Sequence, residues 1–452
     1  MEVEEAPIET GYLGNLTSDQ EKKLQQMWTL LLSAFEFEAV KHEETDLEDS
    51  TVAGSQENGA PKGHKVDVGE GSINREQADK LRQTWLSMLK QENPDGLLLR
   101  FLRARKWDVA QAFSMLKGAL MWRSKEVLVD EEILVKGEPW CARREKTGEG
   151  REKKDAHDFM EQMRMGKVYI RGSDRRGRPV GYVHVAMHKP GAQSEETLEK
   201  LIVQTIETLR CLFNEPPFDS FCVVFDLTDF SLSNMEWQPV KFIIRAFEAN
   251  YPECLGSLLI HNAPFLFAGI WKIIRGLLDP VVAAKVDFTR NVEGLEKYIP
   301  KENIVPTCGG TDDWRYEYQE PAEDEDDRIE HGSDEREKIM VERREIAERF
   351  LAATQEWIKH LDAGEHEEAA IQAQLRSNAV EALWTNYWKL DPYVRSRTML
   401  DRTGVIGPDG SVEMYPERKA AADAAAAAVA ALAIDDRSET PTKKRSRRPI
   451  NR

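Results

Sequence analysis

Two pairs of residues have the type and spacing that catalysis or metal binding would need. His184 and His188 are four residues apart in GYVHVAMH, and they would share one face only if the predicted strand ran through both positions. Glu195 and Glu196 are adjacent at a predicted helix start, where carboxylates interact favourably with the helix dipole. We interpret the histidines as part of a strand and its loop, and the carboxylates as helix-stabilising groups.

The motifs of common enzyme classes do not occur in this sequence. It contains no G-x-S-x-G elbow, no P-loop, no H-E-x-x-H and no G-x-G-x-x-G after a strand. Its nine histidines do not cluster, and its five cysteines are an odd number without C-x-x-C spacing, which is typical of reduced structural thiols. We therefore expect no enzymatic activity, no catalytic residue, no metal and no cofactor.

An apolar helix is predicted over residues 265–278. LLIHNAPFLF, which leads into it, begins as a short apolar run that could be a buried strand, and Pro280 ends the helix. A helix that is apolar nearly all round must be buried or face lipid, and this one is too short to span a bilayer. Its bracketing glycines, Gly269 and Gly276, indicate either flexibility or close packing. On periodicity alone an ordinary core helix is the simpler interpretation. The apolar positions around it are Ile270, Trp271, Ile273, Ile274, Leu277 and Leu278.

Composition indicates a cytoplasmic protein. The chain of 452 residues is long enough for two or three domains, and its acidic N-terminus lacks the features of a signal or transit peptide. A formal net charge of −18 argues against a general nucleic-acid or anionic-membrane binder. Any contact with a membrane must therefore be local.

The order of motifs around the apolar helix resembles the CRAL-TRIO lipid-binding domain. YPE at 251–253, a strand, NAPF at 262–265, the apolar helix and LDPVVAAK at 278–285 follow one another as in that family, where the helix is a mobile gate. The segment 97–123 is similar to the small helical domain that precedes it, and 172–185 is similar to a hairpin of its sheet. The resemblance covers about residues 75–320, and with the long extensions it points to fungal phosphatidylinositol transfer proteins.

The fold that the resemblance implies is α/β, with a mostly parallel sheet flanked by helices, a mobile gate helix, an N-terminal helical domain and helical extensions. Ser18 and Glu21 have capping-box spacing at the start of an N-terminal helix, and the acidic stretch 320–335 is expected to be solvated. Trp384, Tyr387 and Trp388 are expected to pack on the main body. The predicted segments are a helical segment 1–41, a disordered linker 42–74, the N-terminal helical domain 75–150, the lipid-binding domain 151–312, an acidic hinge 313–335, a helical extension 336–416, and a low-complexity and basic tail 417–452.

Three positions match the residues with which this family holds the phosphoinositol headgroup. The resemblance implies that Arg105 and Lys285 contact the phosphate and that Glu253 accepts from the inositol hydroxyls. Val282 departs from the family, because the founding member has a threonine there. The lost hydroxyl would cost about 0.5–1.5 kcal/mol, which binding could survive.

The lipid cavity is expected to be more apolar than that of the founding member. Ile170, Gly181, Phe221 and Val223 stand where the founder reads phosphatidylcholine with hydroxyl groups, so the resemblance implies a second lipid such as a sterol or squalene; simple repacking of the core is the alternative. The remaining residues assigned to the cavity and gate are Phe265, Phe267, Ile270, Trp271, Ile274 and Leu277.

The function implied is exchange of phosphatidylinositol for a second lipid between membranes, with transient docking on the endoplasmic reticulum, a lipid droplet or a mitochondrion. Phosphatidylinositol presented in this way could feed lipid kinases. Three alternatives are a haem carrier, for which Tyr169, Tyr182 and His184 are the suggestive residues, a lipid sensor or scaffold that transfers nothing, and a hydrolase, for which no nucleophile constellation is present.

Overall fold

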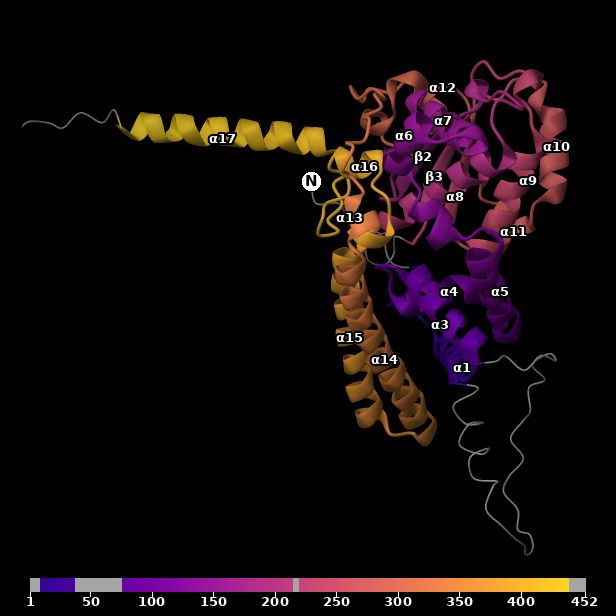
Figure 1. Ribbon diagram of the computed structural model, residues 1–452, viewed down its shortest axis with the longest axis vertical. Helices are drawn as coiled ribbons and strands as arrows, with labels where there is room; N and C mark the ends of the chain where they lie inside the picture. Colours follow the sequence, from indigo (N-terminus) through magenta and orange to yellow (C-terminus); the bar gives the residue numbers. More distant parts are fainter. Residues whose placement is uncertain (1–8, 37–74, 214–218, 439–452) are drawn as a thin grey trace, which may run out of the picture.

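The computed structural model describes residues 9–36, 75–213 and 219–438, whose arrangement is shown in Figure 1. The predicted linker 42–74 and the basic end of the tail, 439–452, lie outside the described residues.

A five-stranded sheet forms the centre of the α/β domain, with its strands in chain order. β1 (Val168–Ser173) pairs antiparallel with β2 (Pro179–His184), and the other neighbours are parallel: β2 with β3 (Phe221–Asp226), β3 with β4 (Leu255–His261), and β4 with β5 (Val286–Thr289). β3 reads FCVVFD, an almost continuous apolar run, as expected for a parallel strand covered on both faces. The predicted α/β class with a mostly parallel sheet is confirmed.

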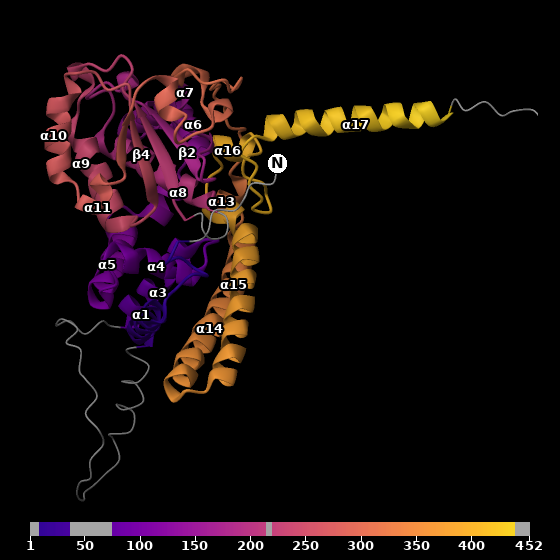
Figure 2. The same ribbon diagram turned by 180° about the vertical axis from the view of Figure 1, so that it is seen from behind.

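One face of the sheet carries the connecting helices. α8 (Glu195–Cys211) joins β2 to β3, α9 (Trp237–Arg245) joins β3 to β4, and α10 (Phe267–Leu277) with α11 (Pro280–Ala283) joins β4 to β5. Since crossovers between parallel strands are right-handed and the strands are in chain order, these helices all lie on the same face. Figure 2 shows α10 as the outermost of them.

The opposite face is covered by the chain that follows β5. α12 (Asn291–Leu295) and the stretch up to residue 316 form a second apolar cluster with the sheet. The cluster consists of aromatic and aliphatic side chains, among them Tyr169, Tyr182, Val224, Leu259, Leu295, Ile299, Ile304, Trp314 and Tyr316.

The N-terminal helices form one layer below the sheet. α1 (Ser18–Glu36), α3 (Arg75–Leu89), α4 (Pro94–Ala104) and α5 (Val109–Met121) share a single apolar core, in which Trp28 and Trp85 stack edge to face. α1 was predicted as a separate segment, but it contributes to the same core as the helices that follow residue 75. Short π-helical turns at Trp122–Glu126 and Val129–Leu134, then α6 (Glu138–Thr147) and α7 (Gly150–Arg164), lead into β1.

The predicted capping box of α1 is shifted by one residue. The Gln20 N–H donates to Thr17 Oγ1 at 3.3 Å, and the Thr17 N–H donates to Gln20 Oε1 at 2.9 Å. Ser18 and Glu21 have the same spacing, and the sequence alone does not distinguish the two registers.

The C-terminal extension contacts both domains. α14 (Ser333–Ala363) and α15 (His366–Val394) form a long antiparallel hairpin that packs beside the N-terminal helices (Figure 1), where Phe350 and Leu383 enter the same core as Trp28. α13 (Asp327–His331), α16 (Met399–Arg402) and α17 (Pro416–Ser438) complete it. Tyr387 and Trp388 are buried against the α/β domain as predicted, whereas Trp384 is exposed.

The acidic hinge is not fully solvated, contrary to the prediction. Asp326 is buried and accepts hydrogen bonds from the Ser396 hydroxyl and the Arg397 N–H, and Glu325 forms an ion pair with Arg402. Burial raises the pKa of Asp326, and its hydrogen-bond donors oppose that rise. These carboxylates therefore anchor the extension, which the local run of charge did not indicate.

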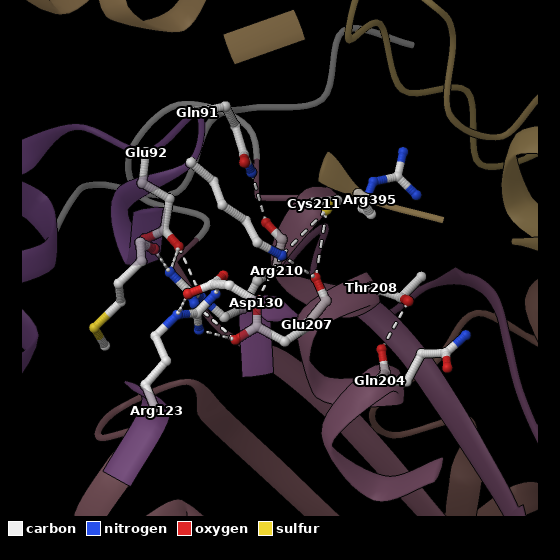
Figure 3. A network of polar contacts seen from close by, with 12 residues as sticks. Gln91, Glu92, Arg123, Asp130, Gln204, Glu207, Thr208, Arg210, Cys211 and Arg395 are labelled. Atoms are coloured by element: carbon white, nitrogen blue, oxygen red, sulfur yellow. Dashed lines mark hydrogen bonds and ion pairs between the residues drawn. The ribbon is translucent and has the colours of Figure 1, made fainter. Parts of the chain in front are cut away.

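A buried polar network joins the N-terminal helices to α8 (Figure 3). Glu207 is fully buried and contacts Lys90 at 2.5 Å, Arg123 at 2.7 Å, Arg210 at 3.1 Å and the Tyr251 hydroxyl at 2.8 Å. Burial alone would raise the pKa of the Glu207 carboxyl, but the three cations lower it well below its ordinary value. The network therefore fixes the helical layer against the α/β domain.

Replacing Glu207 with glutamine is expected to destabilise the protein by about 3–5 kcal/mol, because three cations would lose their shared buried counter-charge. Chemical unfolding monitored by tryptophan fluorescence measures this, with the exposed Glu195→Gln on the same helix as control. The pKa of Glu207 is lower in the folded protein than in the unfolded chain. Its contribution to the free energy of unfolding is therefore fully present above about pH 4.3 and is lost as the pH falls further. An equal loss of stability in Glu207→Gln and Glu195→Gln would contradict the proposal that the network stabilises the fold.

Candidate functional site

The predicted gate helix exists as α10 and carries apolar side chains on both its inner and outer surfaces. Phe267 and Ile270 are buried, and Trp271 and Ile274 pack partly against the same cluster, which includes Phe230 and Ile260. Leu277 is 49% exposed and Phe265, just before the helix, is 96% exposed. The helix is therefore not an ordinary core helix.

An exposed apolar surface surrounds α10 on the outer side of the molecule. Large exposed apolar surfaces on soluble proteins usually mark contact with a partner or a membrane. Its members lie just before α10, on α10, on α11 and at β5: Phe265, Leu266, Ile273, Leu277, Val281 and Phe288. We call these six residues the gate surface.

The two glycines of α10 are not explained by close packing. A Cβ built on Gly269 or Gly276 would meet no described atom within 4 Å. Glycine within a helix costs roughly 0.5–1 kcal/mol relative to alanine, so these two positions lower the stability of α10 without a packing benefit. The sequence predicted either flexibility or close packing at these glycines, and the open space around them favours flexibility.

Three of the predicted cavity residues stand in one row across the sheet. Ile170 pairs with Gly181, and Gly181 pairs with Val223. The row continues from Val223 through Leu258 to Val286 on β5. All of these positions face the side covered by α8, α9 and α10, as does Phe221, two residues before Val223. We call these five paired residues the sheet row.

Gly181 lies beneath α8. A Cβ added there would lie 3.7 Å from Leu209 Cδ1, which is ordinary van der Waals contact, so α8 packs closely over this position without requiring glycine. Phe221 is fully buried, stacks with Phe213 and lies at a tilt against the Phe247 ring. Phe221 therefore fills space between the sheet and the helices that cover it, and its narrowing of a lipid cavity stays a prediction.

Glu253 and Lys285, two of the three predicted headgroup residues, lie together. Lys285 Nζ is 2.9 Å from Glu253 Oε2, and the two side chains are 21% and 15% exposed. Glu253 has φ of 59°, a left-handed conformation that is strained for this residue type and that concentrates at functional sites. The Lys285 carbonyl accepts from the Leu258 N–H, so the pair stands at the β5 end of the sheet row.

Val282, where the founder has threonine, lies close by on α11. Its carbonyl accepts from the Lys285 N–H at 3.0 Å, and its side chain packs partly against the apolar cluster under α8 and α9. A hydroxyl at this position would face that apolar cluster.

Arg105, the third predicted headgroup residue, is not joined to this pair by a recorded contact. It is partly buried at the C-terminal end of α4 and donates to the Ala104 carbonyl at 3.3 Å. Within the described residues it has no recorded ion pair, so its side chain has no anionic partner in this structure.

Arg103, from the same FLRARK motif, is held more firmly. Its guanidinium forms an ion pair with Asp219, donates to the Gly11 carbonyl at 3.0 Å and lies 4.0 Å from the centre of the Tyr12 ring. Burial raises the pKa of Tyr12; the charge of Arg103 opposes this rise, and the charges of Asp219 and Glu253 add to it. Sequence reasoning missed Tyr12 and Asp219, because no motif links them to the headgroup residues.

The three residues suggestive of haem lie on the opposite face of the sheet. Tyr169 and Tyr182 stack at 5.4 Å between ring centres within the cluster closed by residues 291–316. Both ring nitrogens of His184 are engaged, one with the Tyr169 hydroxyl at 3.0 Å and the other with Asp226 at 3.2 Å. They therefore do not face the gate.

His188 is separate from His184, because β2 ends at His184. Its Nε2 is 2.8 Å from Glu236 Oε2, and Lys167 Nζ is 2.9 Å from its Nδ1. Burial lowers the pKa of His188, and it also lowers the pKa of Lys167, to about 8.

The described residues contain no group of three or more potential metal ligands. None of the helices in the described ranges is long and apolar enough to cross a membrane.

Comparison with protein families agrees with this geometry. The CRAL/TRIO domain matches residues 163–310, and the CRAL/TRIO N-terminal domain matches residues 18–118. The chain belongs to the CRAL-TRIO family. The N-terminal match begins before the residues from which the resemblance was predicted, and it includes α1, which agrees with the shared core of α1 and α3–α5.

Two fungal CRAL-TRIO relatives extend the similarity beyond these domains. A CRAL-TRIO domain-containing protein of Schizosaccharomyces pombe is 36% identical over 439 residues, which covers 90% of this chain and 94% of that protein. The phosphatidylinositol transfer protein CSR1 of Eremothecium gossypii is 40% identical over 328 residues, covering 72% of this chain and 71% of that protein. The chain is thus a member of a lipid-binding family with a relative named for lipid transfer.

Proposed function

We propose that this CRAL-TRIO protein transfers phosphatidylinositol between membranes and exchanges it for a second, apolar lipid. The observation that carries the proposal is the sheet row of apolar and glycine positions, which leads under the gate helix to the Glu253–Lys285 pair. A phosphorylated headgroup needs a cation, and inositol hydroxyls need an acceptor. The name of the 40% identical relative supports the same ligand.

Membrane contact is proposed to occur through the gate surface. Phe265 and its neighbours are apolar and exposed, so burying them against a bilayer would be favourable at about 25 cal/mol per Å². Opening of α10 would expose Phe267 and Ile270 as well, which is favourable only next to lipid. The chain is negatively charged overall, so docking would be local and reversible. Phosphatidylinositol held in this way would be available to lipid kinases at the membrane.

The second lipid is proposed to lack a choline headgroup, because Ile170, Gly181, Phe221 and Val223 line the inner face of the sheet without a hydroxyl. Labelled phosphatidylcholine is therefore expected to move between vesicles at least tenfold more slowly than labelled phosphatidylinositol in the same assay. Equal transfer rates for the two lipids would show that other groups recognise choline. Equal rates are also what the alternative predicts, in which these four residues only repack the core and the ligand is unchanged.

Identification of the bound lipid tests the proposal directly. Mass spectrometry of lipids extracted from protein purified from its native host should find phosphatidylinositol together with an apolar lipid. Absorbance near the Soret band tests the haem alternative in the same sample. A protein that carries no extractable lipid, and moves none between vesicles, would instead be a sensor or scaffold.

A further inference from the structure

A cavity of about 80 Å³ lies at the β1 edge of the sheet, outside the gate region. Its walls come from β1, from α8 and from the C-terminal extension, and most of them are apolar. Ile170 of the sheet row lines it, together with Leu201, Leu400, Val405 and Met414. We call this cavity the distal chamber. Leu400, Val405 and Met414 lie beyond residue 310, where the matched CRAL-TRIO domain ends.

The wall that the extension contributes is fixed by buried polar contacts. Arg171 on β1 forms ion pairs with Asp312 at 2.8 Å and with Glu417. The Ser173 N–H donates to the Tyr415 hydroxyl at 2.9 Å, which covers the free edge of β1. On the other side, Arg402 pairs with the buried Glu138. The distal chamber is therefore part of the folded structure and not a gap between loosely placed segments.

The sheet row runs across the strands from the distal chamber to the predicted headgroup site. Ile170 lines the chamber at one end, and Val286 follows Lys285 at the other. Four strand spacings of about 4.8 Å separate them, roughly 19 Å in total, which is comparable to the length of an extended long acyl chain. A lipid whose headgroup contacts Lys285 could therefore place the end of its chain in the distal chamber.

We propose that the distal chamber binds the hydrocarbon end of the carried lipid, so that the C-terminal extension sets the chain length that the protein prefers. This rests on the proposed lipid-transfer function. An unfilled apolar cavity destabilises a fold in proportion to its volume, so hydrocarbon that enters it gains contacts with the apolar walls. The extension acts here as a wall of the lipid site.

The wall also contains polar side chains, and one of them permits a competing occupant. Gln204 on α8 is 6% exposed, and its side-chain oxygen has no hydrogen-bond partner among the described residues. Water or a ligand hydroxyl could pair with it, whereas hydrocarbon could not. The substitution Gln204→Leu keeps the approximate volume and removes this group, so it separates the two occupants.

Filling the distal chamber tests the proposal. Val405→Phe from the extension and Thr205→Met from α8 each reduce its volume from a different side. Val412→Phe is the matched control, because Val412 lies in the same extension but does not line the chamber. Transfer is measured from phosphatidylcholine vesicles that contain phosphatidylinositol with either long or short acyl chains. Circular dichroism and thermal unfolding check that each variant is folded.

Both filling variants are expected to lose about tenfold in the preference for long over short chains, which corresponds to about two fewer buried methylene groups. Val412→Phe should keep the wild-type preference, and Gln204→Leu should keep or strengthen it. An unchanged preference in both filling variants would overturn the proposal while leaving lipid transfer intact. Weaker long-chain transfer in Gln204→Leu would also overturn it, in favour of a polar occupant. Failure of the wild-type protein to transfer any lipid would instead refute the proposed function.

Discussion

Lys285→Ala and Glu253→Ala are each expected to lower phosphatidylinositol transfer by roughly 10- to 150-fold, because a hydrogen bond to a charged group is worth about 1.5–3 kcal/mol. In the structure these two side chains pair with each other at 2.9 Å. A bound headgroup would place its phosphate on Lys285 and its hydroxyls on Glu253, so each substitution removes a contact with the ligand. The measurement is the rate at which labelled phosphatidylinositol moves between vesicles.

The control is a second lysine–glutamate pair in the same domain. Lys301 and Glu296 are 3.4 Å apart and more exposed, and they lie outside the gate region, so Lys301→Ala should leave transfer unchanged. Transfer of an apolar second lipid should persist in Lys285→Ala and Glu253→Ala, since hydrocarbon needs neither charge. Normal phosphatidylinositol transfer by both variants would mean that the family's headgroup residues do not carry over to this chain.

The parts of the site that follow from local sequence were predictable. The resemblance carried by YPE, NAPF and LDPVVAAK singled out Glu253 and Lys285, which the structure places in contact, and α10 ends before Pro280 as predicted. The parallel sheet followed from short apolar runs that alternate with helical patterns. In each case the decisive information lies within a few residues or in the order of motifs.

Features that depend on contacts distant in sequence were not predictable. Asp326 lies in an acidic run that reads as solvated, yet Ser396 and Arg397, about seventy residues away, bury it. Tyr12 approaches Arg103 only through the fold of the N-terminal layer. The distal chamber likewise needs Ile170 and Val405 to meet, and neither residue is unusual within its own segment.

The location of flexibility was only partly predictable. The sequence placed Gly269 and Gly276 at the ends of the gate helix but could not distinguish close packing from freedom to bend. Only the coordinates show open space at both positions, so the gate helix is less stable than alanine would make it. The proposed gating agrees with this, because a segment that opens while the rest of the fold stays closed belongs to the low-stability part of a molecule.

Tethering the gate helix to the body is expected to abolish transfer. Met235, just before α9, and Ile274 on α10 both pack in the apolar cluster under the gate. Met235→Cys with Ile274→Cys, bridged by a short cross-linker that a reductant cleaves, would hold α10 against the body. Since opening of the gate would then be blocked, phosphatidylinositol transfer between vesicles should fall to background and return on reduction. The five native cysteines are buried, so the added thiols should react first.

The tether also separates gating from a merely structural role of α10. Lipid that is already bound should stay trapped in the cross-linked protein and remain extractable by organic solvent, because closing the gate blocks exchange and not binding. Each single-cysteine variant, treated with the same reagent, should exchange lipid as the wild type does. If the cross-linked protein exchanges lipid at the normal rate, α10 is only part of the core. The lipid would then enter by another route, with the gate surface serving some other contact.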